Sequence, residues 1–184
     1  MKTFKRYFLD EQARHPVDKW DEIVADSGEL QAALEIIGAI NNTGSEALIV
    51  GGAARDILLG KTPHDVDIAT NMDIEKVSDL FQAFDIGSSK EFGIVAVPYK
   101  GYTFEIAHYR EEFGTSDSRH PDLVANVDTF EKDSARRDIT INSLGLDSSG
   151  TIIDYQGGLE DLKKKLVKAV GNPRERIKED ALRI

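Results

Sequence analysis

The chain has 184 residues, 40% of them hydrophobic and 30% charged, with a net charge of −10 and no cysteine. This length is sufficient for one full domain, no apolar run approaches the roughly 20 residues of a membrane span, and the N-terminus has no apolar run typical of a signal peptide. Without cysteine there is no disulfide framework or thiolate metal site, so we expect a cytoplasmic protein, and the acidic balance argues against a broad nucleic-acid-coating surface without excluding a local basic groove.

The first half of the chain predicts interleaved helices and strands. Residues 1–26 are polar and mixed, and we expect them to form an N-terminal appendage. Ser27 suits the N-cap of a helix, because apolar residues follow it at helical spacing, namely Leu30, Ala33, Leu34, Ile37 and Ile40. The next segments predict a buried strand running into a tight turn, a short helix, a second strand and a longer helix, at residues 46–52, 53–60, 66–70 and 74–84.

The second half predicts a β-hairpin and then mainly helical segments. Residues 93–110 alternate with period two around a Tyr-Lys-Gly-Tyr turn. The later segments predict a polar loop, a helix, a strand, a turn followed by a helix, and the start of another helix, at residues 117–124, 129–146, 151–155, 156–170 and 171–184. Because the hairpin must pair antiparallel, we expect an α+β domain with a mixed, partly antiparallel sheet flanked by helices.

Two aspartates on the second predicted strand indicate a metal site. Asp65 and Asp67 are two residues apart, so on a strand both carboxylates project from the same face. Like charges that close repel each other, and a divalent cation such as Mg2+, which prefers carboxylate and phosphate oxygens, would keep both ionised. The alternative is a solvated strand end, but the glycine-containing segment before the pair favours metal.

That preceding segment suits a phosphate group. Gly51 and Gly52 stand where a strand turns into a helix, so the backbone can approach a phosphate closely. Arg55 lies one turn into the helix, within reach of a phosphate or a terminal hydroxyl, and Asp56 is interpreted as a structural partner. An ordinary tight turn is the alternative. The segment is not interpreted as a P-loop, because the Gly-Lys-Thr at residues 60–62 lacks the glycine five residues earlier that the P-loop pattern requires.

A third carboxylate, Glu105, lies on the second arm of the predicted hairpin. A third acid beside an aspartate pair completes a two-metal site, in which one metal activates an attacking hydroxyl and the other stabilises the leaving group. The alternative for Glu105 is a cross-strand salt bridge.

Residues 50–70 also resemble the signature of class II tRNA nucleotidyltransferases, the CCA-adding enzymes, and of their relatives the bacterial poly(A) polymerases. Later stretches agree in order, among them FEIAHYR, RRDITINSL and DYQGGLEDL. The resemblance covers roughly residues 46–184. It implies a DNA polymerase β-like nucleotidyltransferase head domain in residues 27–171, followed by the start of a helical neck in residues 172–184.

This resemblance implies template-independent addition of CMP and AMP, from CTP and ATP, to a tRNA 3′ end, with Mg2+ and release of pyrophosphate. By position, Asp65 and Asp67 would bind Mg2+. The nucleotide would be held by the residues that match the family's binding motifs, namely Gly51, Gly52, Arg55, Arg136, Arg137 and Asp138. Guanidinium groups suit phosphates, and a carboxylate accepts hydrogen bonds from ribose hydroxyls. A solvated helix surface is the alternative for the two arginines.

Asp180 and Arg183 match the family's Glu-Asp-x-x-Arg motif. They are three residues apart on a predicted helix and hence on one face, and in the family these side chains pair with the Watson–Crick edge of the incoming base. Local ion pairs with Arg176 and Glu179 are the alternative. The chain ends one residue after Arg183, whereas the family continues through a neck, body and tail, so we expect a fragment that is poorly active alone.

Two other functions stay open at this point. One is a poly(A) polymerase, or an enzyme that adds only CC or only A; the other is a non-catalytic nucleotide-binding fragment. The polar loop at residues 117–124 resembles that of CCA-adding enzymes more than that of poly(A) polymerases. The intact acidic and arginine motifs favour an enzyme, and no membrane partner is predicted.

Overall fold

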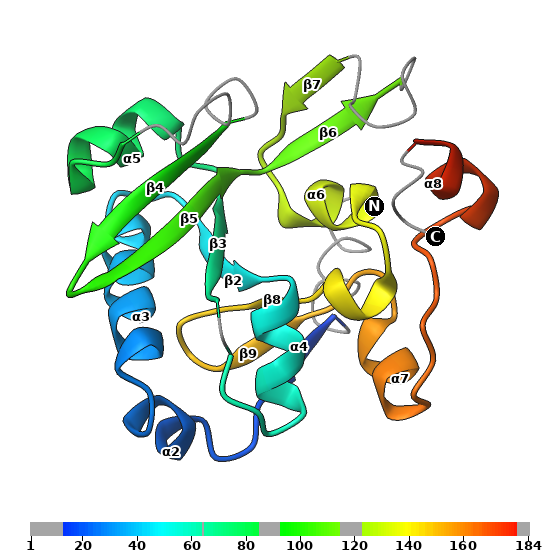
Figure 1. Cartoon of the computed structure of the whole chain (residues 1–184), viewed down its shortest axis with the longest axis horizontal. Helices are drawn as coiled ribbons and strands as arrows, with labels where there is room; N and C mark the ends of the chain where they lie inside the picture. Colours follow the sequence, from blue (N-terminus) through cyan, green and yellow to red (C-terminus); the bar gives the residue numbers. More distant parts are fainter. Residues whose placement is uncertain (1–12, 64, 85–92, 115–122, 180–184) are drawn as a thin grey trace, which may run out of the picture.

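A seven-stranded sheet lies at the centre of the molecule (Figure 1). The structure is a computed structural model that describes residues 13–63, 65–84, 93–114 and 123–179. The strands are β1 Arg14–Pro16, β2 Ala47–Val50, β3 Asp67–Thr70, β4 Ile94–Tyr99, β5 Tyr102–His108, β6 Arg110–Phe113, β7 Leu123–Asn126, β8 Gly145–Leu146 and β9 Thr151–Ile153. The helices are α2 Trp20–Ala25, α3 Gly28–Asn41, α4 Gly52–Leu58, α5 Ile74–Phe81, α6 Phe130–Arg136, α7 Gly158–Lys163 and α8 Pro173–Glu179, with a 3₁₀ turn η2 at Thr140–Asn142.

The sheet is mixed, as the sequence predicts. Its strand order is β1-β9-β8-β2-β3-β5-β4, and β6 and β7 form a separate two-stranded sheet. Only β3 and β5 pair in parallel among the strands that the structure describes. None of the described helices is long and apolar enough to cross a membrane. The arrangement confirms the expected α+β class, with helices packed on a partly antiparallel sheet.

The two faces of the sheet bury different clusters. Side chains alternate along each strand, so Ile49, Ile68 and Ile106 enter one core together with apolar residues of α3, α4 and α5. The neighbouring strand residues Leu48 and Val50 enter a second, smaller cluster on the opposite face, which also contains an aromatic residue of α6. The polar site described below lies beside this second cluster.

Local signals placed several elements correctly. Ser27 caps α3, because its hydroxyl accepts a hydrogen bond from the Leu30 N–H at 3.2 Å. The β4–β5 hairpin turns at Lys100 and Gly101, whose φ angles are 50° and 86°. Positive φ at both central residues is the geometry that matches the twist of a two-residue hairpin. These features depend on near neighbours in the sequence, which explains why they are predictable from it.

The prediction of one helix over residues 129–146 is wrong. Helix α6 ends at Arg136, and Arg137 is already extended, with φ −64° and ψ 162°. The chain then pairs with a segment 30 residues later, since the Val170 N–H donates to the Asp138 carbonyl and the Thr140 N–H donates to the Lys168 carbonyl. The same pairing shortens the predicted helix at residues 156–170 to α7. Non-local backbone pairing therefore overrides the local helical pattern.

The described part of the predicted appendage packs against the rest of the molecule. Strand β1 pairs antiparallel with β9 at the edge of the sheet. Trp20, at the start of α2, lies over Gly150, where an added Cβ would be 2.3 Å from the indole Cγ. From Arg14 onward this segment therefore contributes an edge strand and a helix to the fold.

Candidate active site

Three acidic residues converge where β3 begins beside the middle of β5. Ile68 of β3 is in register with Ile106 of β5, and both point into the core, so Asp67 and Glu105, one residue earlier, project from the opposite face. The pKa of the Asp67 carboxyl is raised, first by partial burial, then by the negative charges of Glu105 and Asp65, while Arg137 opposes the shift. Neither Asp67 nor Glu105 forms an ion pair with another described residue, so the predicted salt-bridge alternative for Glu105 finds no support among them.

Asp65 does not lie on the strand, contrary to the prediction. Strand β3 begins at Asp67, which pairs with Val50, the last residue of β2. Beyond that pair β2 turns into α4 at Gly51, so residues 65 and 66 have no strand to pair with. Asp65 nevertheless lies close enough to Asp67 to raise its pKa.

Gly51 stands between the acidic group and an arginine. Its φ of 69° and ψ of −136° belong to backbone space that glycine adopts and other residues avoid. An added Cβ at Gly51 would lie 3.7 Å from Arg137 Nη1 and 4.0 Å from Asp67 Oδ2. The turn therefore brings exposed backbone, a guanidinium and a carboxylate together. A phosphate-containing ligand with a bound cation could contact all three.

Arg55 is held by its neighbours. Its Nε and Nη2 both lie 2.9 Å from Asp56 Oδ1, and its Nη1 donates to Asn142 Oδ1 at 2.6 Å. The bond to Asn142 joins α4 to η2. Gly52, at the start of α4, lies against the same guanidinium, because an added Cβ there would be 3.4 Å from Arg55 Nη2.

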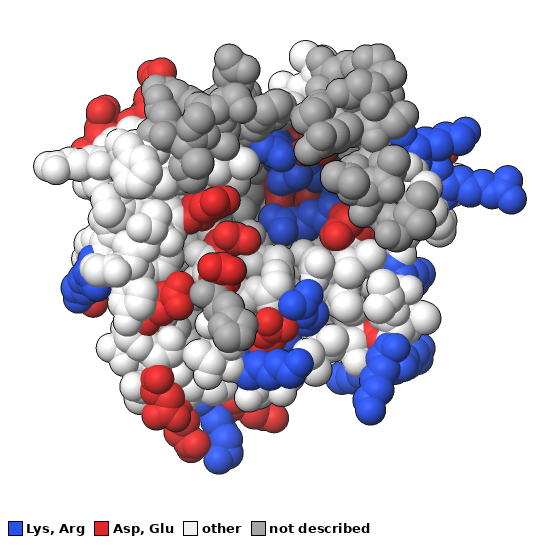
Figure 2. Space-filling view, viewed as in Figure 1, with Lys and Arg blue, Asp and Glu red and all other residues white. Residues whose placement is uncertain are grey.

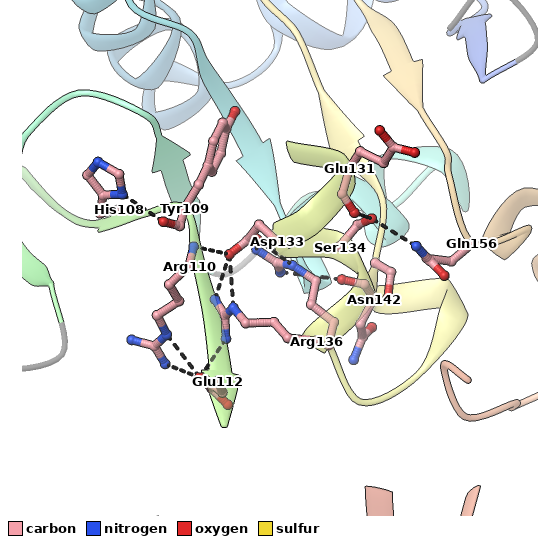
Figure 3. A network of polar contacts seen from close by, with 12 residues as sticks. His108, Tyr109, Arg110, Glu112, Glu131, Asp133, Ser134, Arg136, Asn142 and Gln156 are labelled. Atoms are coloured by element: carbon pink, nitrogen blue, oxygen red, sulfur yellow. Dashed lines mark hydrogen bonds and ion pairs between the residues drawn. The ribbon is translucent and has the colours of Figure 1, made fainter. Parts of the chain in front are cut away.

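Asp133 organises the arginine pair, which Figure 3 shows in part. Its side chain is fully buried. Oδ1 accepts from Arg136 Nε at 2.9 Å and from the Arg110 backbone N–H at 3.1 Å, and Oδ2 accepts from Arg137 Nη2 at 2.9 Å. Burial alone would raise the pKa of the Asp133 carboxyl, but Arg137 and Arg136 outweigh it and hold the pKa below its ordinary value. These contacts rule out the solvated helix surface.

The two arginines differ in what remains available to a ligand. Arg136 Nη1 donates to Glu112 Oε1 at 2.9 Å, and the Arg136 carbonyl accepts from Arg176 of α8 at 3.1 Å, so this residue links α6 to β6 and α8. Arg137 instead directs Nη1 toward Gly51, with a long contact of 3.5 Å to the Asn142 carbonyl. Arg137 is therefore the arginine that faces the acidic group.

The other predicted binding residues divide between the described and the undescribed parts of the chain. Asp138 is half-buried, and its Oδ1 accepts from the Ile139 N–H at 2.7 Å. Asp180 and Arg183 lie outside the described residues. Sequence reasoning missed Asp133 and Asn142. The polar asparagine within the run of mostly apolar residues after the Arg-Arg-Asp motif is the one signal that points to Asn142.

The surface over β3 and β5 carries a row of acidic side chains beside a hollow that basic side chains line (Figure 2). Among the described residues, no group of three or more histidines or acids is arranged to hold a metal ion by itself. Mg2+ sites that bind nucleotides take only one or two carboxylates from the protein and complete their shell with phosphates and water. The arrangement suits such a shared site.

Comparisons with known proteins agree on one family. A family model described as "Poly A polymerase head domain" matches residues 47–168. The CCA-adding enzyme of Streptococcus pyogenes is 46% identical over 157 residues, which are 85% of this chain and 39% of the relative. The crystal structure of the Bacillus stearothermophilus CCA-adding enzyme in complex with CTP has a TM-score of 0.74 and 39% identity, covering 85% of this chain and 37% of that one.

A second solved structure is a tRNA nucleotidyltransferase complexed with a primer tRNA and an incoming ATP analog. It is 29% identical, with a TM-score of 0.61, and the match covers 80% of this chain and 42% of that one. The chain thus spans less than half the length of the relatives it matches.

Proposed function

This chain belongs to the family of poly(A) polymerase head domains, and from that premise we propose that it is the nucleotidyltransferase part of a CCA-adding enzyme. Such an enzyme transfers CMP and AMP from CTP and ATP to the 3′ end of a tRNA. The observation that carries the proposal is the convergence of Asp65, Asp67 and Glu105 opposite Arg137 across the bare backbone of Gly51. Such a site matches the charges of a metal-bound triphosphate.

The acidic group fits a divalent metal, which nucleotidyltransferases of this family generally use. We propose Mg2+, held by Asp65 and Asp67 with Glu105 as the third carboxylate. Partial burial, and then the negative charges of Glu105 and Asp65, raise the pKa of Asp67, and a bound cation would relieve this repulsion between the acids. When bound, the metal would neutralise charge on the phosphates and lower the pKa of the attacking 3′ hydroxyl.

The chain's own residues would then position the nucleotide. Gly51 and Gly52 let the backbone approach the triphosphate, and Arg137 donates to its oxygens. Arg136 and Arg55 position other parts of the site and do not contact the nucleotide directly, because their guanidinium groups are already bonded within the protein. Asp138 has a second carboxylate oxygen that could accept from a ribose hydroxyl. Asp180 and Arg183 remain our candidates for reading the base.

CCA addition is preferred over poly(A) synthesis because the curated relatives and the solved structure with CTP carry that name. The family model's description, which mentions poly(A) polymerase, keeps the second activity as the alternative. A cysteine-free protein acting on tRNA is also expected to work in the cytoplasm.

Metal-dependent nucleotide binding tests the site. The wild-type chain is expected to bind CTP and ATP with Mg2+ and to lose most of that affinity when EDTA is added. The double variant Asp65→Asn with Asp67→Asn is expected to bind weakly under both conditions. Asp73→Asn, which alters an exposed helix cap remote from the site, is the matched control. Equal CTP affinity in the wild type and the double variant would refute the assignment.

Product sequencing tests the reaction. A tRNA transcript that lacks its three 3′-terminal nucleotides is incubated with the chain, CTP, ATP and Mg2+. Addition that stops after CCA supports the proposal, and a long adenosine tract would replace it with poly(A) synthesis. Because the chain is much shorter than its relatives, single-turnover conditions with excess protein are the appropriate assay.

A further inference from the structure

Residues 163–178 carry a net positive charge, although the chain as a whole is negatively charged. Residues 163–178 contain seven of the 23 Lys and Arg residues but one of the 33 Asp and Glu residues. Their net charge is +6 in a chain whose total is −10. The remaining residues are therefore strongly acidic, and a polyanion approaching the molecule would be repelled from most of its surface.

Most of these basic side chains are exposed. The exposed members define what we call the basic strip: Lys163, Lys164, Lys165, Lys168, Arg174 and Lys178. Lys164 pairs with Glu160 at 3.1 Å, and Lys168 lies 3.9 Å from Asp161. Lys163, Lys165 and Arg174 form no ion pair with any residue in the described part of the chain, so their charges are available to a ligand.

The fold fastens the basic strip to the candidate active site. Backbone bonds join Lys168 to Thr140 and Val170 to Asp138, directly after the arginine pair. Farther along, Arg176 of α8 donates to the Arg136 carbonyl at 3.1 Å. The strip therefore runs from α7 past the Arg-Arg-Asp motif to α8. Figure 2 shows basic side chains along this edge of the molecule, on the same face as the acidic row.

We propose that the basic strip binds the phosphate backbone of the RNA whose 3′ end enters the active site. The inference rests on the proposed function and adds the surface along which the RNA approaches. Lysine and arginine side chains neutralise phosphates whatever the base sequence, which positions a strand without reading it. Near the acidic site such contacts also offset the repulsion between the RNA and the carboxylates.

The test removes three unpaired charges of the strip. The triple variant Lys163→Gln, Lys165→Gln, Arg174→Gln is compared with a control that removes three charges from the N-cap of α2, from α5 and from the hairpin turn: Lys19→Gln, Lys76→Gln, Lys100→Gln. Fluorescence anisotropy measures binding of a tRNA transcript without its CCA end between 50 and 200 mM salt. Thermal unfolding and CTP binding with Mg2+ are measured on every variant.

Each phosphate contact contributes about 0.7–0.9 to the slope of log affinity against log salt. Removing three contacts is expected to reduce that slope by about 2.1 to 2.7, so the affinity deficit of the strip variant relative to the wild type shrinks by about 18- to 42-fold between 50 and 200 mM salt. The control is expected to keep the wild-type slope, and all variants to keep wild-type CTP binding. A wild-type slope in the strip variant, an equal change in the control, or no tRNA binding by the wild type would each overturn the proposal. Failure of the proposed function appears separately, as absent Mg2+-dependent CTP binding by the wild type.

Discussion

Replacing Asp133 by asparagine should destabilise the protein strongly. The Asp133 side chain has no exposed surface, and those of Arg136 and Arg137 are 17% and 15% exposed. Asparagine keeps one acceptor oxygen but turns its amide N–H groups toward the N–H groups of one arginine. Removing one partner from a buried charged cluster costs about 3–5 kcal/mol, because the remaining charges lose their compensation. We expect a loss of that size in the free energy of unfolding.

Urea denaturation at pH 7 measures this loss, and a domain with about 5–15 kcal/mol of stability would retain a measurable transition. The matched control is Glu160→Gln, which removes a carboxylate from an exposed i,i+4 pair with Lys164 and should cost about 0.5 kcal/mol or less. If Asp133→Asn cost no more than this control, the conclusion that Asp133 holds the arginine pair would be wrong.

The pH dependence of the same variant gives a second test. The pKa of Asp133 in the folded protein lies below its ordinary value of 3.8. A depressed carboxyl pKa contributes stability that is complete above the unfolded-state value and is lost as the pH falls through the folded-state value. The difference between the wild type and Asp133→Asn should therefore be constant near neutrality and shrink below about pH 4. A difference that grew with acidification would contradict this assignment.

Three further substitutions test packing and the division between the arginines. Gly158→Ala should cost about 2 kcal/mol or more in urea denaturation, because the added Cβ would lie 2.2 Å from the Thr140 carbonyl oxygen. Gly38→Ala in α3, where the added Cβ meets nothing within 4 Å, should stabilise by up to about 1 kcal/mol, and a loss there would contradict the packing argument. Arg137→Lys should weaken CTP binding about tenfold more than Arg136→Lys, and equal effects in a CTP titration would refute the distinction between them.

What the sequence could predict of the site is what depends on near neighbours. Strand β2 follows from its run of apolar residues, the β4–β5 hairpin follows from alternation, and the two turns follow from residues that tolerate positive φ. Their order along the chain places Gly51 and Asp67 close together once β2 and β3 pair. The acidic side of the site was therefore predictable, apart from the position of Asp65 before the strand.

The arginine side was less predictable, because it depends on distant segments. The residues around Asp133 have a helical pattern, and nothing local shows that α6 stops at Arg136. The stop follows from backbone pairing with residues 168–170. The burial of Asp133 follows in turn from its contacts with Arg110 of β6 and both arginines. The different orientations of Arg136 and Arg137 are a consequence of this packing.

The carboxylates of Asp67 and Asp133 both interact with Arg137, but their pKa values shift in opposite directions. The pKa of Asp133 is lowered because two guanidinium groups compensate it, whereas that of Asp67 is raised because partial burial and two further acids outweigh Arg137. Asp133 is therefore neutralised within the protein. Asp67 retains negative charge that only a ligand from outside can compensate, which is the electrostatic condition for a metal site.

This contrast predicts a stability effect that depends on metal. Without Mg2+, Asp67→Asn should raise the free energy of unfolding at pH 7, because a carboxyl with a raised pKa disfavours the folded state once it is ionised. With Mg2+ and CTP added, the wild type should instead be more stable than Asp67→Asn. Ligand at 100 times its Kd stabilises the wild type by about 2.7 kcal/mol, and Asp67→Asn should gain little. Thermal unfolding with Mg2+ and CTP, and with EDTA, measures both states. An equal gain in the two proteins would show that the charge on Asp67 does not hold the metal.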